Sequence, residues 1–455
     1  MVTIYFVIYS SGVGFSALLV STIRAMRRPQ QVERASELAP RLFLSYLVDG
    51  AQPTLLWESG KETQMKILDF IEKDGEGKYS CYKTKKLILD SNDQDTLDYD
   101  DKPALQLNSA QIAESDMSRK ETVLINAHMM KLASTPLFSF FLDGSRHVYK
   151  VDDIAIGNRI FPFLAGQIVV GCCERKDRDT FKCHSVTRKV LLSLPRNFNY
   201  DDDKEANFCR MYCEKINEEL EKNIFVQEHG IKIDKILLYP TDGSKDITAD
   251  KNGYKNSGTA KIQNEMTDEE QLMVAQLCKN NCLDNEHFLI KDGSIEYNSS
   301  YSNLSTTEWN QLRSNYKHVV GVSKLFNPDL LRDFKGHRLS KTIANLKPYE
   351  RTKVYRYPAS GSQSEFAMWY LRLRNSNFRE TNFSDVIKCE MVLEEKGGVL
   401  DTQLVDIISA NLIREAYPTC YGKDNRWANH LYPVFLTESF CKSNYINQNI
   451  ILNLF

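Results

Sequence analysis

Apolar runs separated by short polar segments predict that much of this chain alternates between strands and helices. Residues 137–142 and 287–290 are apolar runs of strand length, and the tripeptide Asp-Gly-Ser follows soon after each, at Asp143 and at Asp292. The stretch from 167 to 194 predicts two further strands joined by a charged turn. Continuous apolar runs are typical of strands that are buried on both faces. The pattern therefore predicts a mixed sheet with an aspartate at the tip of two central strands.

Helical spacing of apolar residues follows these strands. Residues 203–222 and 401–415 carry their apolar positions on one side, which predicts two amphipathic helices. Residues 267–270 read Thr-Asp-Glu-Glu, the pattern of a capping box, and predict a helix that begins there and leads into the strand ending at Asp292. The polar residues 240–263 are predicted to be a loop.

The C-terminal part of the chain adds further strands. The pattern predicts them at residues 319–324, 353–357, 367–373 and 431–436. Together with the central strands they predict an α/β protein with a mixed sheet flanked by helices. We expect residues 1–120 to form an irregular N-terminal unit, and residues 121–455 to form the main domain, with an insertion at about 200–262.

Charge is unevenly distributed along the 455 residues, although the net charge is only −2. The segment from Arg313 to Arg374 contains thirteen Lys or Arg residues against four Asp or Glu, whereas residues 90–101 contain six acids and no base. A basic segment beside a carboxylate site suits a polyanionic substrate, and it equally suits a solvated face. The small net charge argues against a uniformly basic coat for nucleic acid.

Residues 2–23 contain no charged side chain and are followed by three arginines within five residues. This length suits a membrane anchor, but several serines and glycines dilute the run. We therefore favour a helix or strand that packs on the body of the protein or docks a partner, and expect no membrane attachment. The eleven cysteines are scattered, without a Cys-x-x-Cys pair, which predicts free thiols in the cytoplasm.

The two aspartates suggest a shared metal site. Acidic residues at two strand tips and on an adjoining helix form the arrangement that holds two divalent cations for phosphodiester hydrolysis. Asp143 and Asp292 are the predicted strand ligands. Glu270 is the predicted helix ligand, with Glu269 as the alternative. Both lie at the start of the predicted helix, and the helix and the strand after it are long enough to bring that start near the strand tip at Asp292. Asp-Gly is also a common turn dipeptide, so the opposite interpretation is two turns without a metal.

Other residues complete the candidate site. His430 or Glu438 is the predicted fourth ligand or proton carrier. Lys324, at a strand end, and Arg351 are predicted to contact phosphate groups, and both are equally compatible with solvated surface charges. The sequence contains no phosphate-binding P-loop motif, no Gly-x-Ser-x-Gly and no His-Glu-x-x-His, so it gives no support to those catalytic classes.

The order of short motifs resembles that of the NurA nuclease family. The motifs are Asp-Gly-Ser-Arg at 143–146, the glutamates at 269–270, Asp-Gly-Ser at 292–294, Val-Gly-Val-Ser-Lys at 320–324, Glu-Arg-Thr at 350–352 and Tyr-Pro-Val-Phe-Leu-Thr-Glu at 432–438. The resemblance spans about residues 137–445. Phe440 stands near the place where the family carries a histidine, so either His430 or Glu438 takes over that role or the activity is weakened.

The resemblance implies an RNase H-like fold and cleavage of DNA that depends on Mn²⁺ or Mg²⁺, with two ions at Asp143, Glu270 and Asp292. It adds Arg146 to the residues expected to contact nucleic acid. It further implies a homodimer that works beside a HerA-type hexameric ATPase in DNA end processing or phage defence. The alternatives are a catalytically inactive RNase H-like scaffold and an Argonaute-like protein that binds a nucleic-acid guide.

Overall fold

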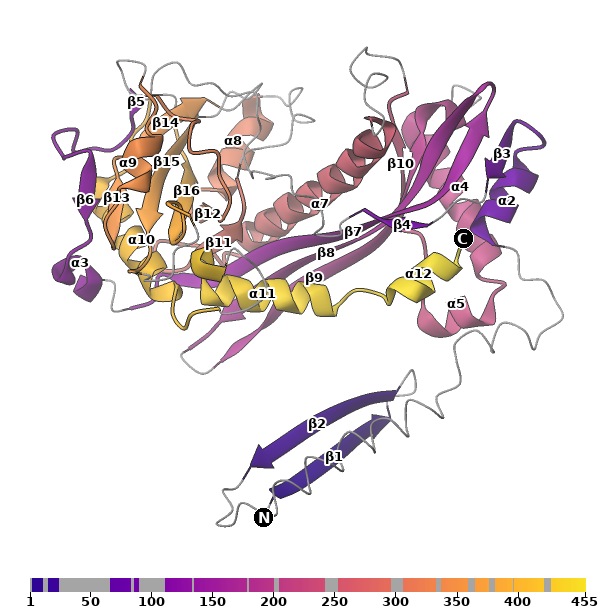
Figure 1. The fold of residues 1–455 in the computed structure, drawn as a ribbon, viewed down its shortest axis with the longest axis horizontal. Coiled ribbons are helices and arrows are strands. Elements are labelled where there is room, and N and C mark those ends of the chain that lie inside the picture. The colour runs from indigo at the N-terminus through magenta and orange to yellow at the C-terminus, as the bar shows by residue number, and fades with distance from the viewer. Residues whose placement is uncertain are drawn as a thin grey trace. The chain divides into compact units, whose positions relative to one another are not determined.

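The computed structural model defines most of the chain beyond residue 110 and shorter parts before it. It describes residues 2–10, 15–23, 66–82, 86–89, 111–132, 135–177, 180–199, 204–241, 253–295, 306–332, 337–358, 365–375, 381–395, 397–420 and 427–455. Figure 1 labels the helices and strands of the chain, which divides into two compact units. The first comprises residues 1–77 and 211–233 with Phe455, and the second comprises residues 78–210 and 234–454. The predicted domain boundary near residue 120 stays a prediction.

The centre of the second unit is a mixed sheet with RNase H-like strand order. Strands β9, β8, β7, β11 and β12 lie side by side in that order. The first three form an antiparallel meander, and β11 and β12 are parallel to β7. The bounds are β7 Phe138–Ile156, β8 Arg159–Arg175, β9 Phe181–Pro195, β11 Phe288–Asp292 and β12 Val319–Ser323. This order confirms the predicted α/β class and the RNase H-like sheet.

Further strands extend this sheet on both sides. Strand β10 (Lys235–Tyr239) pairs in parallel with β9. Beyond β12 the order continues through β16, β15, β13 and β6, with antiparallel pairing. The remaining bounds are β3 Tyr79–Tyr82, β4 Leu87–Ile88, β5 Gln111–Ile112, β6 Thr122–Leu124, β13 Glu350–Thr352, β14 Tyr355–Pro358, β15 Glu365–Arg372 and β16 Val386–Val392.

Helices cover both faces of the sheet. Successive strand residues point to opposite faces, so an apolar strand presents apolar side chains on both, and helices bury each set. Leu142 and Leu289 belong to one buried cluster together with side chains of α7 (Gly253–Lys279). Phe141 and Ile290, their neighbours in sequence, belong to a second cluster with side chains of α10 (Thr402–Glu415). The other helices of this unit are α3 Ala127–Leu132, α8 Thr306–Asn315, α9 Ser340–Ala344, α11 Tyr432–Ser443 and α12 Gln448–Asn453.

The first unit contains an antiparallel hairpin and packed helices. Strands β1 (Val2–Ser10) and β2 (Phe15–Ile23) pair along their whole length, so the apolar run predicted as a helix or strand consists of two strands. Helix α2 (Ile67–Asp74) packs its Phe70 ring against Tyr212 of α4 (Glu205–Leu220), and α5 (Ile224–His229) follows. Within the described residues, every helix is too short or too polar to cross a bilayer.

The first Asp-Gly-Ser segment does not end a strand, contrary to the sequence prediction. Strand β7 continues through Asp143 and Gly144, because its partner β8 pairs with it on both sides of this point. The second segment is as predicted: β11 ends at Asp292, and Gly293 adopts a φ of +79°, a conformation that glycine tolerates best. A third copy, at 242–244, lies outside the described residues.

Two predicted elements of the C-terminal half also differ. Helix α7 begins at Gly253, so residues 253–263 are helical and Thr267 lies inside the helix, where its hydroxyl donates to the carbonyl of Gln263. Residues 432–443 form helix α11, whereas a strand was predicted at 431–436. The proline at 433 stands in the first turn of α11, where the absence of an N–H costs nothing.

Candidate active site

Asp143 and Asp292 occupy neighbouring positions on two parallel strands. Leu142 of β7 pairs with Lys291 of β11. Asp143 and Asp292 are the next residues on the two strands and therefore lie side by side. Asp143 is only 6% exposed. Burial raises the pKa of Asp143 well above its ordinary range, and the negative charges of Asp292, Glu438 and Glu270 raise it further against the opposing charge of Lys324. The structure thus brings the two predicted strand ligands together in a site that disfavours two bare carboxylates.

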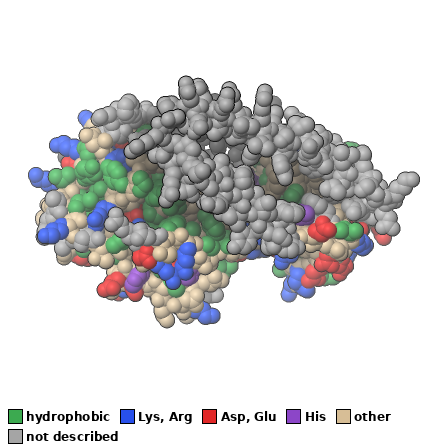
Figure 2. All heavy atoms as spheres, turned by 90° about the horizontal axis from the view of Figure 1, so that it is seen from below, with side chains coloured by type: hydrophobic (Ala, Val, Ile, Leu, Met, Phe, Trp, Pro, Cys, Tyr) green, Lys and Arg blue, Asp and Glu red, His purple; other side chains and the backbone are tan. Residues whose placement is uncertain are grey.

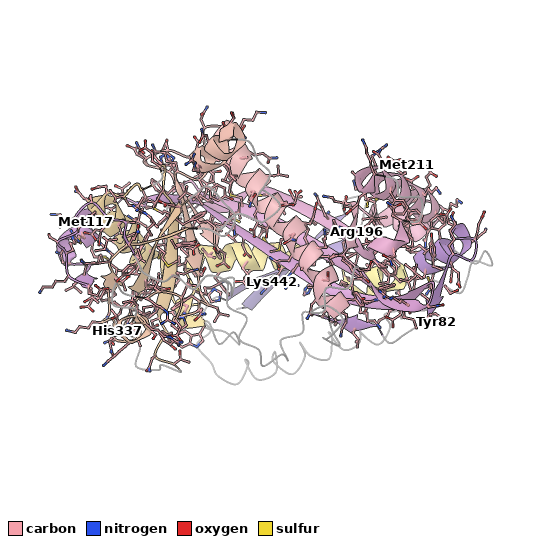
Figure 3. The ribbon with its side chains drawn as sticks, turned by 90° about the horizontal axis from the view of Figure 1, so that it is seen from above. Tyr82, Met117, Arg196, Met211, His337 and Lys442 are labelled. Atoms are coloured by element: carbon pink, nitrogen blue, oxygen red, sulfur yellow. The ribbon has the colours of Figure 1, made fainter. Side chains whose placement is uncertain are left out.

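Lys324 and Glu438 complete this side of the site. The ammonium of Lys324, just beyond β12, lies 2.7 Å from Asp292 Oδ2 and 3.2 Å from Glu438 Oε2. Lys442, on the same helix α11 (Figure 3), lies 2.7 Å from Glu438 Oε1. Burial opposes ionisation of Glu438, but Lys324, Lys442 and His430 outweigh it and hold its pKa at about 2. Glu438 is therefore a carboxylate at neutral pH.

His430 lies close to this group. Its Nδ1 is 3.9 Å from Glu438 Oε2, the residue is buried, and its ring meets the Phe435 ring edge to face. The preceding residue, Asn429, donates through Nδ2 to the backbone carbonyl of Lys324 at 2.9 Å. This bond ties the segment before α11 to the end of β12, so both predicted candidates for the fourth position reach the site.

Glu270 reaches β7 from the opposite side of the strand. A Cβ on Gly144 would overlap Glu270 Oε1, so the absence of a side chain lets helix α7 bring this carboxylate against β7. Gly171 is the partner of Asp143 across β8, and a Cβ there would overlap Cys441 Sγ of α11. Because residues paired across strands share a face, Asp143 projects toward α11 and away from the face that Glu270 approaches.

Glu270 has its own counter-ion. Lys291 Nζ lies 2.8 Å from Glu270 Oε2, and both side chains are buried. Burial raises the pKa of Glu270 although Lys291 opposes this. Burial lowers the pKa of Lys291, but the negative charges of Glu270, Asp292 and Asp143 outweigh burial and raise this pKa above its ordinary value.

The structure separates the two glutamates between which the sequence left a choice. Glu269 lies 2.5 Å from the ammonium of Lys189 on β9, and the same ammonium lies 2.9 Å from Glu265. Glu269 therefore belongs to an ion-pair cluster at β9, whereas Glu270 adjoins the aspartates.

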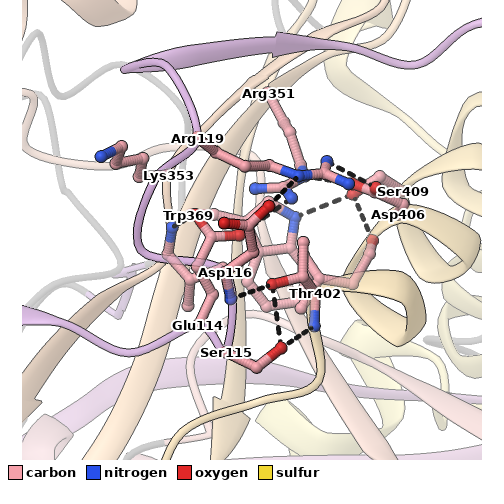
Figure 4. Close-up of polar contacts among 12 residues, drawn as sticks. Glu114, Ser115, Asp116, Arg119, Arg351, Lys353, Trp369, Thr402, Asp406 and Ser409 are labelled. Carbon is pink, nitrogen blue, oxygen red and sulfur yellow. Dashed lines mark hydrogen bonds and ion pairs between the residues drawn. The ribbon is translucent and has the colours of Figure 1, made fainter.

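Two of the three side chains predicted to contact phosphate, Arg351 and Arg146, contact other protein side chains instead. Arg351 is completely buried, with Nε 2.8 Å from Asp406 Oδ1 and Nη2 3.0 Å from Glu114 Oε2 (Figure 4). It connects β13 to α10 and is inaccessible to a nucleic acid in this structure. Arg146 is partly exposed and donates from Nε to Gln263 of α7 at 2.5 Å.

Part of the basic segment of the sequence is buried. Lys324, Arg372 and Arg374 are buried together with Arg351, and Lys317 is paired with Glu394 at 2.8 Å. On the face drawn in Figure 2, Lys and Arg side chains are interspersed with Asp and Glu. Four of the cations between 313 and 374 are therefore enclosed by the fold.

The chemistry of the donors suits a hard divalent cation. In the described part of the chain, no three His, Cys, Asp or Glu side chains converge as a metal-binding group, so the predicted set of Asp143, Glu270 and Asp292 is not assembled. Asp143 and Asp292 lie side by side on β7 and β11 and offer carboxylate oxygens there. Mg²⁺ is commonly held by one or two carboxylates, with water and substrate phosphate as its other ligands. The two aspartates fit this type of site.

Sequence reasoning missed two of the lysines that adjoin the acids, Lys291 and Lys442. Lys291 interrupts an apolar strand, and a charged residue in such a position is rarely buried without a partner. That signal was present in the sequence, but the partner, Glu270, lies on a helix whose start was misplaced. Lys442 gives a weaker signal: its spacing of four residues from Glu438 predicts an ion pair only if residues 432–443 are helical.

Comparisons with known proteins give a likeness among solved structures. The chain matches no protein-family model and no curated protein sequence. Among solved structures it is similar to the NurA nuclease from Sulfolobus solfataricus, with a TM-score of 0.36 and 12% sequence identity over 70% of this chain and 83% of that chain.

Proposed function

We propose that this protein is a nuclease that hydrolyses DNA phosphodiester bonds with the help of a divalent cation, Mn²⁺ or Mg²⁺. The observation that carries the proposal is the pair Asp143 and Asp292. They meet on adjacent central strands of an RNase H-like sheet, and the negative charge of Asp292 adds to the burial that raises the pKa of Asp143. A cation between two such carboxylates removes that cost, which is the usual reason to keep them together.

The side chains around this pair have distinct proposed roles. Asp143 and Asp292 would hold the cation, which when bound favours deprotonation of water and neutralises phosphate charge. In the hydrolysis, a water oxygen bonds to phosphorus, one ester P–O bond breaks, and the departing oxygen takes up a proton. His430 is the proposed proton carrier, because imidazole accepts or donates a proton at a ring nitrogen. Glu438 orients both His430 and Lys324.

Cleavage of labelled DNA tests this proposal. Purified protein is incubated with single- and double-stranded oligonucleotides in Mn²⁺, Mg²⁺ or EDTA. We expect cleavage only with metal, and a loss of at least about 100-fold in Asp143→Asn and Asp292→Asn, the size typical of losing electrostatic stabilisation at a reacting centre. Glu286→Gln, an exposed carboxylate just before β11, is the matched control and retains full activity. Undiminished cleavage by both aspartate variants contradicts the proposal.

The lysines favour a second candidate, an inactive scaffold of the same fold. Lys324 and Lys291 already lie beside three of the four acids, so ion pairs do part of what metal would do. This candidate predicts that the wild-type protein binds no Mn²⁺ and cleaves no DNA in any metal. The cleavage assay, combined with Mn²⁺ binding, separates the two candidates.

The wider setting is also part of the proposal. We propose a cytoplasmic homodimer that acts beside a HerA-type hexameric ATPase, on the strength of the motif order that resembles the NurA family. Light scattering of the purified protein tests the dimer, and co-expression with such an ATPase tests the partnership. A monomer at all concentrations, or an ATPase whose activity is indifferent to this chain, contradicts the respective part.

A further inference from the structure

Lys324 places a buried positive charge beside two acids of the site. Its ammonium contacts Asp292 and Glu438 at 2.7 and 3.2 Å, and the residue is only 5% exposed. A hydrogen bond from Asn429 to its backbone carbonyl fixes the start of the side chain, and β12 fixes the residues before it. The ammonium is thus a positive charge built into the site.

The charges of the site are balanced except at Asp143. Glu270 lies beside Lys291, and Glu438 contacts both Lys324 and Lys442. In the described part of the chain, the structure gives Asp143 no ion pair, although its carboxyl is buried. One carboxylate therefore lacks a direct counter-ion, and it adjoins Asp292, which has a second oxygen besides the one that contacts Lys324.

We infer that the site takes a single divalent ion, at Asp143 and Asp292, and that the Lys324 ammonium supplies the positive charge that a second ion provides elsewhere. Two-metal sites hold their ions about 3.5–4 Å apart and share a carboxylate between them. Here Asp292 is the shared carboxylate, with the ammonium on one side and Asp143 on the other. The inference rests on the proposed metal-dependent activity and replaces the two ions expected from the sequence by one.

Glu270 fits this inference. A second ion would need a third carboxylate. Glu270 approaches the opposite side of β7 and contacts Lys291, and Glu438 contacts Lys324, whose removal would leave Glu438 open to a second ion. The pairing with Lys291 makes Glu270 a positioning residue that secures α7 against β7 beside Asp143. Lys291 pairs with Glu270, and Lys324 pairs with Asp292 and Glu438. These ion pairs explain why the acids of this site do not form a metal centre with three carboxylates.

Counting bound Mn²⁺ tests the inference. Free Mn²⁺ is followed by electron paramagnetic resonance while it is titrated into the full chain, and heat of binding is measured in parallel. We expect one ion per chain for the wild type and for Lys324→Arg, which keeps the charge, and two for Lys324→Met, which removes it. Lys317→Met, an exposed lysine paired with Glu394, is the matched control and binds one ion.

Each result is decisive. Two ions in the wild type, or one ion in a folded Lys324→Met, overturns the inference while leaving the proposed nuclease intact, provided that Mn²⁺ supports cleavage. No ion in the wild type, together with no cleavage, overturns the nuclease proposal itself. If Lys324→Met does not fold, as judged by circular dichroism, the counts for the wild type and Lys324→Arg still decide, because two ions in either contradict a fixed second charge.

Discussion

Gly144 and Glu270 are in direct apposition: the carboxylate of Glu270 lies where a side chain of Gly144 would be. The glycine of the first Asp-Gly-Ser segment thus serves close packing of α7 on β7, and not a turn. Its neighbour Asp143 is carried on the other side of the same strand. The relationship divides the acids of the site between the two faces of the sheet.

The Gly144→Ala variant tests this packing. We expect a loss of about 1–3 kcal/mol in the free energy of unfolding, the usual cost of forcing an extra carbon into a packed site. Urea unfolding measures it. In the double variant Gly144→Ala, Glu270→Asp, the shorter side chain of aspartate makes room for the new methyl group. We therefore expect the double variant to lose less free energy of unfolding than the two single variants lose together. Full additivity contradicts the apposition.

Removing the charge of Asp143 should stabilise the folded protein in the absence of metal. Because burial raises the pKa of Asp143 in the folded state, the unfolded chain releases this proton at lower pH. Stability of the wild type therefore falls as pH rises above the ordinary aspartate range. Asp143→Asn lacks this loss, so we expect its Tm to exceed that of the wild type by about 2 °C or more at pH 8.

Calorimetry in EDTA at pH 5 and pH 8 measures this difference, which we expect to grow with pH. Mn²⁺ should raise the Tm of the wild type and leave that of Asp143→Asn unchanged. The excess in Tm of the variant over the wild type therefore shrinks or changes sign when metal is added. Glu286→Gln, with its exposed side chain, follows the wild type throughout. A variant that is less stable than the wild type at both pH values contradicts the prediction.

Much of the sheet was predictable because its strands are locally consistent. The apolar run ending at Asp292 and the helix that Asp401 caps through the N–H of Leu404 agree with the structure, since each carries its signal within a few residues. Asp143 at a strand tip was wrong, because pairing with β8 along both flanks outweighs the local turn preference of Asp-Gly. Long-range pairing of this kind leaves no mark in the neighbouring sequence.

The site was predictable in part for the same reason. Asp143 and Asp292 come together because they follow two apolar runs that pair in the sheet. The start of α7 was misplaced, since Gly253 and Gly258 weaken the helical signal that packing on the sheet overrides. The burial of Arg351 was not predictable, because a charged residue in a polar context gives no indication that it will be buried with acids from distant segments.

The low pKa of Glu438 predicts a loss of stability in acid. The folded-state pKa is about 2, below the ordinary value of 4.5, so the stabilisation is complete above about pH 5 and is lost as pH falls toward 2. The shift corresponds to about 3 kcal/mol. We expect Glu438→Gln to be less stable than the wild type by about this amount at pH 7 and by progressively less toward pH 3. Urea unfolding across this range measures the difference, and a gap that is constant with pH contradicts it.

The buried network around Arg351 predicts a variant that loses stability but not affinity for DNA. Arg351 contacts Asp406 and Glu114, and Arg119 contacts the other oxygen of Asp406 at 2.6 Å (Figure 4). Arg351→Met leaves two buried carboxylates with fewer partners, so we expect a loss of about 3–5 kcal/mol in the free energy of unfolding.

Lys353→Met is the matched control, because this side chain is partly exposed and donates only to a backbone carbonyl. We expect it to change stability by less than about 0.5 kcal/mol. DNA affinity, measured by fluorescence anisotropy at a temperature where both variants are folded, should match the wild type. A selective loss of affinity in Arg351→Met would instead support the phosphate contact predicted from the sequence, and would require Arg351 to leave its buried partners when DNA binds.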